Sequence, residues 1–240
     1  MKGIILAGGS ATRLRPLTKV TSKQLLPVYN KPMIFYPIET LAQAGIKDIL
    51  IIVGPQYAGH FLNLLGSGKE LGLKFAYEVQ EEPKGLADAF LVGENFIGKD
   101  DVTMILGDNI FEHDFTESIQ DFKGGARIFA KKVHDPERFG VVEFNEDFKV
   151  LSIVEKPEHP KSDYAAVGIY IYDNKVIKYA RELNPSERGE IEIVDLHNKY
   201  RENGELDVRI IEGMWEDAGT FDSLLRVSNF MAAREKDKAS

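Results

Sequence analysis

A glycine pair and two cations follow the first apolar run of the sequence, and together they could hold a phosphate group. Residues 3–7 are apolar, Gly8 and Gly9 come next, and Arg13 and Lys23 follow in the same stretch. Glycines let backbone N–H groups approach an anion closely, and an arginine can hold phosphate oxygens through two parallel hydrogen bonds. A glycine pair after a strand is by itself more often a tight turn, but the two cations favour a phosphate site. Further hydroxyl donors could come from Ser10 and Thr12.

The charge of the chain is distributed unevenly around these residues. The formal net charge is −8, yet residues 1–38 carry six lysines and arginines and no acidic residue, so the remainder carries −14. An acidic protein is a poor general binder of nucleic acid, whereas a local basic segment favours a small polyanion. On charge alone, a solvated basic surface explains this segment equally well.

Two aspartates would suit a metal ion, although Asp217 does not stand out from the sequence alone. Asp108 follows Gly107 after the run 101–106, and Asp217 lies in a segment that also contains Gly219. Mg²⁺ prefers oxygen ligands and often takes one or two carboxylates together with substrate phosphates. An isolated aspartate after a strand is more often a turn or helix-capping residue, so spacing alone does not establish the site.

Gln80 is a candidate for base recognition. Its amide can pair with an amide-like base edge, as in uracil or thymine, and Gly85 would let the backbone lie near that base. A polar residue that merely leaves a strand is an equally good explanation of Gln80 when the sequence is taken alone.

Other kinds of chemistry find little support. The chain has no cysteine, which excludes disulfides and thiolate sites and is compatible with the cytoplasm. Its five histidines form no i, i+4 ligand pair, and we interpret them as structural or surface residues. The apolar start is too short for a signal peptide, and no stretch of about 20 apolar residues predicts a membrane span.

The spacing of apolar residues predicts how these groups are positioned. Strands are expected at 3–7, 48–54, 74–79 and 101–106, alternating with helices at 33–44, 57–65 and 86–96. Such alternation predicts an α/β fold, Rossmann-like, with a mostly parallel sheet flanked by helices. Ligands of such sheets bind beyond the carboxyl ends of the strands, where Gly8-Gly9 and Gly107-Asp108 would lie.

The second half of the chain has a different pattern. Closely spaced β-like runs predict an added mixed or antiparallel portion, at 127–133, 140–144, 150–155, 166–172 and 208–211. Helices are expected at 174–183, 192–202 and 221–236. We predict one domain over 1–240, with a nucleotide-binding portion at 1–125, a sugar-binding portion at 126–220 and a C-terminal helix at 221–240.

Several ordered motifs resemble those of the sugar nucleotidyltransferases, and most nearly those of the glucose-1-phosphate thymidylyltransferases. At the N-terminus the matching segments are 6–16, 22–27 and 31–33; later ones are 106–111, 135–142, 155–157, 188–193 and 215–220. The sequence departs from the family at Ala11, where glycine is usual. If that position needs a positive φ, alanine costs about 1 kcal/mol there.

The resemblance implies Mg²⁺-dependent transfer of dTMP from dTTP, or of UMP from UTP, to glucose 1-phosphate, with release of pyrophosphate. The sugar phosphate is already mostly ionised at pH 7, since its second pKa is about 6, so no general base is needed. Catalysis would then consist of positioning and charge neutralisation. The product would feed polysaccharide synthesis, and the family commonly forms homo-oligomers.

The resemblance also assigns roles to residues. Arg13, Lys23 and Asp108 would be catalytic, and Asp108 and Asp217 would bind the metal. Nucleotide contacts would come from Leu6, Gly8, Gly9, Ser10, Thr12, Arg13, Lys23, Gln24, Gln80 and Gly85. Contacts to the sugar phosphate would come from Asn109, Gly140, Glu155, Lys156 and Val167, some of them through the backbone.

Two alternatives remain open. One is a neighbouring enzyme specificity, with UTP, CTP or GTP as donor or another hexose 1-phosphate as acceptor. The other is an inactive relative that only binds nucleotide-sugars; such a protein should lack one of the charged residues that the reaction needs, and Arg13, Lys23, Asp108 and Asp217 are all present. The chain also ends soon after Asp217, as in short forms of the family, which predicts an incomplete regulatory site.

Overall fold

The structure of this chain is a computed structural model that describes residues 1–9 and 11–239. Its strands are β1 (Lys2–Ala7), β2 (Pro27–Val28), β3 (Lys31–Pro32), β4 (Asp48–Val53), β5 (Lys74–Val79), β6 (Val102–Leu106), β7 (Asn109–Phe111), β8 (Ala126–Lys132), β9 (Gly140–Phe144), β10 (Val150–Glu155), β11 (Tyr164–Tyr172), β12 (Leu206–Ile210) and β13 (Trp215–Asp217). Its α-helices are α1 (Phe35–Gln43), α2 (Ala58–Leu65), α3 (Asp88–Val92), α4 (Glu94–Ile97), α5 (Thr116–Gln120), α6 (Lys175–Glu182), α7 (Ile193–Glu202) and α8 (Phe221–Ala239).

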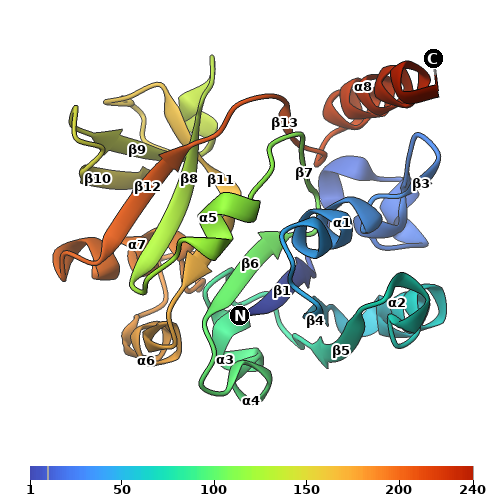
Figure 1. Ribbon diagram of the computed structural model, residues 1–240, viewed down its shortest axis with the longest axis horizontal. Coiled ribbons are helices and arrows are strands. Elements are labelled where there is room, and N and C mark those ends of the chain that lie inside the picture. The colour runs from blue at the N-terminus through green and yellow to red at the C-terminus, as the bar shows by residue number, and fades with distance from the viewer. Residues whose placement is uncertain (10, 240) are drawn as a thin grey trace.

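The centre of the molecule is one mixed sheet. Strands β6, β1, β4 and β5 are parallel neighbours, and β11 joins them antiparallel at β6. On the other edge of β11, strand β8 pairs with both of its ends and is followed by β12, while the hairpin β9–β10 pairs with the first half of β11. Figure 1 shows β9 and β10 at one end of the molecule and β5 with α2 at the other. The predicted α/β fold with an added antiparallel portion is confirmed.

The parallel strands are buried on both faces, which explains their nearly continuous apolar runs. In β1, Ile4 and Leu6 face one apolar cluster, and Ile5 and Ala7 face another on the opposite side. This follows from the two-residue period of a strand. Helices α3, α4, α6 and α7 cover the first cluster, whereas α1, α2 and α5 cover the second.

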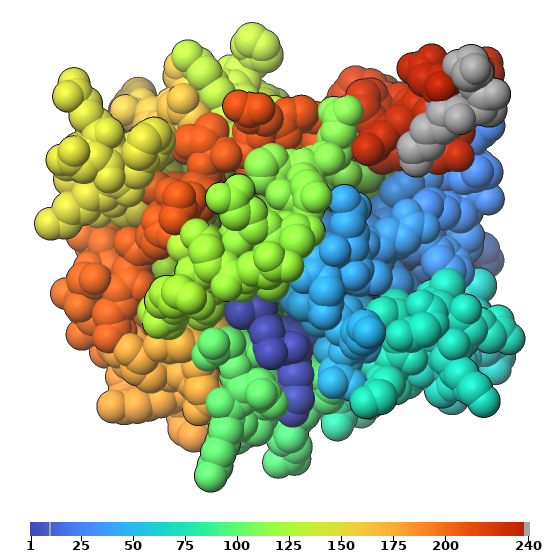
Figure 2. All heavy atoms as spheres, in the orientation of Figure 1, coloured from blue at the N-terminus to red at the C-terminus, as the bar shows by residue number. Residues whose placement is uncertain are grey.

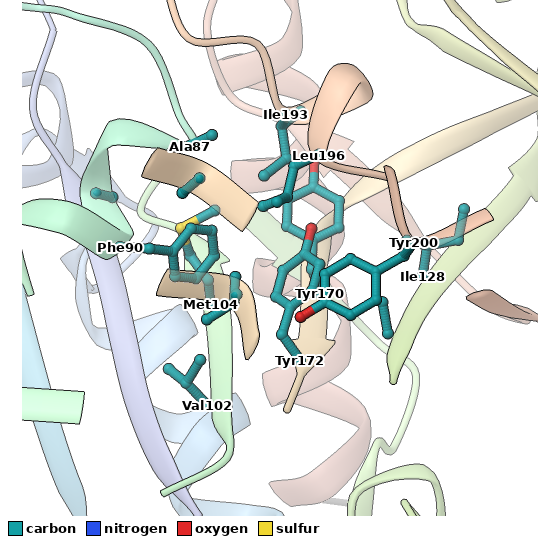
Figure 3. Packing of buried hydrophobic residues seen from close by; sticks show 14 of the residues in the cluster. Ala87, Phe90, Val102, Met104, Ile128, Tyr170, Tyr172, Ile193, Leu196 and Tyr200 are labelled. Carbon is teal, nitrogen blue, oxygen red and sulfur yellow. The ribbon is translucent and has the colours of Figure 1, made fainter. Parts of the chain in front are cut away.

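Tyrosine rings fill much of the first cluster between β11 and α7. Tyr170 and Tyr172 of β11 pack beside Tyr200 of α7, with the Tyr172 and Tyr200 ring centroids 5.5 Å apart. Figure 3 shows these rings together, with Leu196 of α7 next to them. These rings pack on one face of β11, and Ile169 and Ile171 pack into the second cluster on its other face, so the strand is fixed on both sides.

Two local features differ from the expectations. The helix expected at 86–96 is divided into α3 and α4 at Gly93, where a Cβ atom would lie 3.0 Å from Leu50 Cδ2. The close approach of this segment to the sheet therefore requires glycine. The short strands β7 and β13 were not predicted, because three residues carry too little periodicity; they pair antiparallel after Asp108.

The C-terminal helix packs on a separate, smaller apolar cluster. Val227 and Met231 of α8 contact residues that follow β1, among them Val28 and Met33. Figure 2 shows this red segment beside the blue N-terminal region. The division of the chain into nucleotide-binding and sugar-binding portions stays a prediction, since β8, β11 and β12 belong to the same sheet as β1. No helix within the described residues is long and apolar enough to cross a membrane.

Candidate active site

The loop after β1 has an irregular backbone. Gly9 has a φ of 102°, and Ala11 adopts the left-handed conformation with φ 44° and ψ 43°. The carbonyl oxygen of Ala11 accepts a hydrogen bond from Thr18 Oγ1 at 2.8 Å, which holds the loop in place. Position 11 thus has a positive φ, and this chain places alanine where glycine has no steric penalty. Ser10, a predicted nucleotide contact, lies outside the described residues.

Lys23 and Asp108 form a largely buried ion pair. The Lys23 ammonium donates to Asp108 Oδ2, and the exposed side-chain fractions are 16% and 11%. Burial alone would lower the pKa of Lys23, but the charge and hydrogen bond of Asp108 outweigh it and raise that pKa. Burial alone would raise the pKa of Asp108, but Lys23 and the amide of Asn109 lower it below its ordinary value. Both groups are therefore held in their charged forms.

Asp217 lies next to this pair because β13 pairs with β7. Asp217 is opposite Asn109 in the antiparallel ladder, and the backbone N–H of Ala218 donates to the Asp108 carbonyl at 2.9 Å. The Oδ1 atom of Asp217 is buried and has no hydrogen-bond partner among the described residues. Burial, together with the charge of Asp108, raises the pKa of Asp217 to about 6. A buried carboxylate oxygen without a partner is suited to a cation.

Arg13 reaches the same place from the N-terminal loop. A Cβ atom built on Gly219 would lie 2.8 Å from Asp217 Oδ1 and 3.2 Å from an Arg13 guanidinium nitrogen. The positive charge of Arg13 also opposes the increase in the pKa of Asp217. The two predicted cations and the two predicted carboxylates therefore meet in one cluster, which we call the charged junction: Arg13, Lys23, Asp108 and Asp217.

Asn109 connects the charged junction to the neighbouring strands. Its Nδ2 donates to Asp108 Oδ1 at 3.1 Å. Its Oδ1 accepts from Trp215 Nε1 at 2.7 Å and from the backbone N–H of Gly168 at 3.1 Å. Gly168 leaves room for this amide, because a Cβ atom there would overlap the Asn109 side chain. The amide of Asn109 is thus fixed in orientation by three hydrogen bonds.

A cavity of about 500 Å³ opens on the Lys23 side of the charged junction. The predicted residues Gly8, Gly9, Lys23 and Gln80 all line it. Its wall also includes Arg15 and Lys19, Gly54 to Tyr57, Glu81 and Pro83. A pocket of this size with a glycine turn and several cations at one end can hold a phosphorylated nucleoside.

A second cavity, of about 360 Å³, opens on the Asp217 side. Its lining contains the predicted residues Asn109, Gly140, Glu155 and Lys156, together with Arg13 and Asp217 of the charged junction. Lys156 has a φ of 43° and pairs with Glu155 at 2.9 Å. A lysine in the left-handed region is a strained position of the kind that often occurs at binding sites.

Five predicted contacts do not line either cavity. Thr12 is exposed, and the side chains of Leu6 and Gln24 are buried, with Gln24 Oε1 accepting from Ser22 Oγ. Gly85 faces Ile191, whose carbonyl oxygen a Cβ atom there would strike. The Val167 side chain belongs to the apolar cluster on the other face, because its neighbours Ala166 and Gly168 face the cavity. For Leu6, Gln24, Gly85 and Val167 only backbone contacts to a ligand remain as predictions, whereas a side-chain contact of the exposed Thr12 stays a prediction.

Several residues that line the second cavity received no role from the sequence, among them Arg188, Trp215, Tyr170 and His197. Tyr170 is only 4% exposed and belongs to the first apolar cluster, whereas Trp215 is partly exposed. His197 is fully buried, neither of its ring nitrogens bonds to a described residue, and burial lowers its pKa to about 3. The only signal for Arg188 was its place in a family motif.

Comparison with known proteins matches the sequence of this chain to one family. The model of the family described as "Nucleotidyl transferase" matches residues 2–234. The chain belongs to the nucleotidyl transferase family. This family therefore includes a member whose glycine loop, charged junction and two cavities are arranged as described above.

Individual relatives support the same assignment within the nucleotidyl transferase family. The chain is 53% identical over 237 residues to the glucose-1-phosphate thymidylyltransferase of Neisseria meningitidis, covering 96% of this chain and 82% of that protein. It is 50% identical over 242 residues to the enzyme of the same name from Mycobacterium tuberculosis, covering 98% and 84%.

Solved structures agree with this sequence comparison. A Bacillus anthracis chain described as a glucose-1-phosphate thymidylyltransferase, crystallised with sucrose, is 48% identical with a TM-score of 0.92, covering 96% of this chain and 94% of that one. A UDP-glucose pyrophosphorylase in complex with UDP-glucose is 26% identical with a TM-score of 0.84, covering 97% and 98%.

Proposed function

We propose that this chain is a glucose-1-phosphate thymidylyltransferase that transfers dTMP from dTTP to α-D-glucose 1-phosphate and releases pyrophosphate. The observation that carries the proposal is that the charged junction contributes to both cavities, since Lys23 lines the first and Arg13 and Asp217 line the second. The cavity beside Gly8 and Gln80 suits a nucleoside triphosphate, and the cavity beside Glu155 and Trp215 suits a sugar phosphate. The relatives at about 50% identity carry the name of this activity.

In this reaction an oxygen of the sugar phosphate attacks the α-phosphorus of the nucleotide. A bond forms between that oxygen and the α-phosphorus, the bond to the β-phosphate oxygen breaks, and pyrophosphate leaves with the bonding electrons. The attacking phosphate is already ionised, so the chain has to align two anions and neutralise their charge. Lys23 lines the first cavity and Arg13 the second, and both would offset this charge.

The charged junction fits a magnesium ion. Asp108 and Asp217 would hold it, since one buried Asp217 oxygen has no partner and both carboxylates lie side by side. No group of three or more metal-ligating side chains occurs in the described part of the chain, but Mg²⁺ usually takes only one or two carboxylates and completes its shell with water and phosphate oxygens. When bound, the ion would neutralise charge on the reacting phosphates.

On the sugar side, Lys156 and Arg188 would contact the phosphate of glucose 1-phosphate, and Glu155 would accept a hydrogen bond from a sugar hydroxyl. All three line the second cavity, and aromatic rings of Trp215 and Phe139 pack 5.3 Å apart in its wall. Apolar rings beside a few polar groups are typical of sugar pockets, where a ring face packs on the sugar and polar groups orient it.

A second candidate is the use of UTP in place of dTTP. The likeness to a UDP-glucose pyrophosphorylase supports it, and an amide at Gln80 can pair with uracil as well as with thymine. We also propose that the enzyme acts in the cytoplasm as a homo-oligomer; the absence of cysteine supports the first part, and exposed apolar side chains such as Val20 and Leu225 support the second.

Pyrophosphate release from purified protein tests these proposals. The nucleotides dTTP, UTP, dCTP and GTP are each incubated with Mg²⁺ and with glucose 1-phosphate or another hexose 1-phosphate. We expect the highest kcat/KM for dTTP with glucose 1-phosphate. A higher kcat/KM for UTP would show that the second candidate, use of UTP, is the correct one. If no combination of nucleotide and sugar phosphate released pyrophosphate, a nucleotidyltransferase activity would be refuted.

A further inference from the structure

The amide of Gln80 lies at the wall of the first cavity with one end already bonded. Its Nε2 donates to Asp88 Oδ2 at 2.7 Å, and it also lies 3.4 Å from the carbonyl oxygen of Gly85. A carboxylate and a carbonyl oxygen can only accept hydrogen bonds, so the end of the amide that faces them must be the nitrogen. Gln80 Oε1 consequently faces the other way.

The opposite end of this amide is directed at the nucleotide cavity. Gln80 Oε1 is the atom nearest to a Cβ built on Gly8, at 3.6 Å, and both residues line the cavity. Among the described residues nothing donates a hydrogen bond to this oxygen. Gln80 therefore presents a hydrogen-bond acceptor, and not a donor, to the first cavity.

Asp88 is itself held in place by the surrounding backbone. It is the first residue of α3, and the loop before it is joined to the segment around Ile191 by two hydrogen bonds, Ile191 N–H to the Lys84 carbonyl at 2.7 Å and Ala87 N–H to the Ile191 carbonyl at 3.2 Å. On the other side, the Gln80 backbone N–H donates to the Val53 carbonyl at 2.9 Å. Both partners of the side-chain hydrogen bond are thus fixed to rigid elements.

We propose that Asp88 is a positioning residue for nucleotide selection, because it fixes the orientation of the Gln80 amide. A glutamine amide that was free to flip would present either its oxygen or its NH₂ group to the base. It would therefore bind thymine, uracil or cytosine. With the nitrogen bound by Asp88, the oxygen accepts the N3–H of thymine or uracil. Cytosine has an acceptor at N3 and would leave two acceptors facing each other.

This inference rests on the proposed function, since it concerns the nucleotide that the first cavity takes. It adds a residue outside that cavity's wall and assigns its action to orientation of another side chain. It does not separate dTTP from UTP, which present the same N3–H.

The test measures kcat/KM for the pyrimidine nucleotides dTTP and dCTP in the variants Asp88→Asn and Asp88→Ala. The asparagine side chain would offer Gln80 a donor as well as an acceptor. The alanine variant would leave only the Gly85 carbonyl as a partner. In both variants the Gln80 amide would be free to flip. We expect the ratio of kcat/KM for dCTP to that for dTTP to rise about tenfold in each variant, through a lower KM for dCTP. The variant Glu117→Gln is the control, because it removes an acid from the first turn of another helix, α5.

Titration calorimetry with dTTP and dCTP repeats the comparison without turnover. Equal loss of dTTP and dCTP affinity in both variants would show that Asp88 is only structural and overturn the inference, as would a changed ratio in Glu117→Gln. If the wild-type chain binds dTTP more tightly than dCTP but releases no pyrophosphate, the proposed function fails. The role of Asp88 is still decided in that case, by whether the ratio of dCTP to dTTP affinity changes in the Asp88 variants.

Discussion

The ammonium group of Lys23 lies against the carboxylate of Asp108, although 85 positions separate these two residues in the sequence. The pair is largely buried at the carboxyl end of the parallel strands, and Asp217 and Arg13 lie beside it. The charges of the two substrates would meet at this point. Each charged residue of the junction can therefore be tested for its effect on activity and on stability separately.

Asp108→Asn should leave the fold intact and abolish turnover. Asparagine has the same shape and can still accept the hydrogen bond from Lys23, but it loses the negative charge that a metal ion requires. We expect kcat to fall by at least about 100-fold, with a circular dichroism spectrum like that of the wild type. Asp147→Asn, at an exposed position in the β9–β10 hairpin, is the control. Turnover at the wild-type rate in Asp108→Asn would refute the metal assignment.

Lys23→Met should destabilise the protein more than the double variant Lys23→Met/Asp108→Asn does. The single change leaves two largely buried carboxylates, Asp108 and Asp217, without the lysine that offsets them, and this should cost about 3 kcal/mol of unfolding free energy. Removing the Asp108 charge as well relieves part of that loss. Urea unfolding of the two variants and the wild type at pH 7 measures the difference. A double variant that is less stable than Lys23→Met would contradict the expectation.

Asp217 should make the metal-free protein less stable as the pH rises. Its pKa is about 6 in the folded protein, above the ordinary 3.8, so between pH 5 and 7.5 the folded state releases a proton that the unfolded state has already lost. The free energy of unfolding should therefore fall by about 1 kcal/mol over this range from Asp217 alone.

Asp217→Asn isolates this contribution. In the presence of a chelator, the variant should gain stability relative to the wild type between pH 5 and pH 7.5, and should be the more stable of the two at pH 7.5. Urea unfolding at several pH values measures both quantities. If the stability difference between the two proteins does not change with pH, Asp217 does not titrate in this range.

Ala11→Gly should stabilise the loop after β1. Ala11 has a φ of 44°, a left-handed conformation that costs a residue with a Cβ about 1 kcal/mol more than glycine, although glycine's freer unfolded chain offsets part of this. We expect a net gain of about 0.5 kcal/mol in thermal or urea unfolding. Ala232→Gly, inside α8, should instead lose about 1 kcal/mol. A loss of stability in Ala11→Gly would show that the strain is relieved elsewhere.

The fold class and most of the elements were predictable from local patterns in the amino-acid sequence. Runs such as 48–54 and 74–79 are long, apolar or alternating, and end at glycine or at a change of periodicity, so their strands were predicted within one or two residues. The glycine loop and its cations were also visible, because a stretch of 38 residues without an acid is unusual in an acidic chain. These features are local, so they can be recognised in the sequence without knowing which residues contact them in the folded protein.

Only the tertiary structure decided which residues face one another. Pairing of β13 with β7 brings Asp217 to Asp108, and neither three-residue strand has a periodic pattern of its own. The alternation of side chains along β11 turns Val167 into the core and leaves Gly168 against Asn109. The contact between Asp88 and Gln80 depends on the path of the intervening loop. Such contacts join residues that are distant in the sequence or separated by irregular backbone, so side-chain spacing does not encode them.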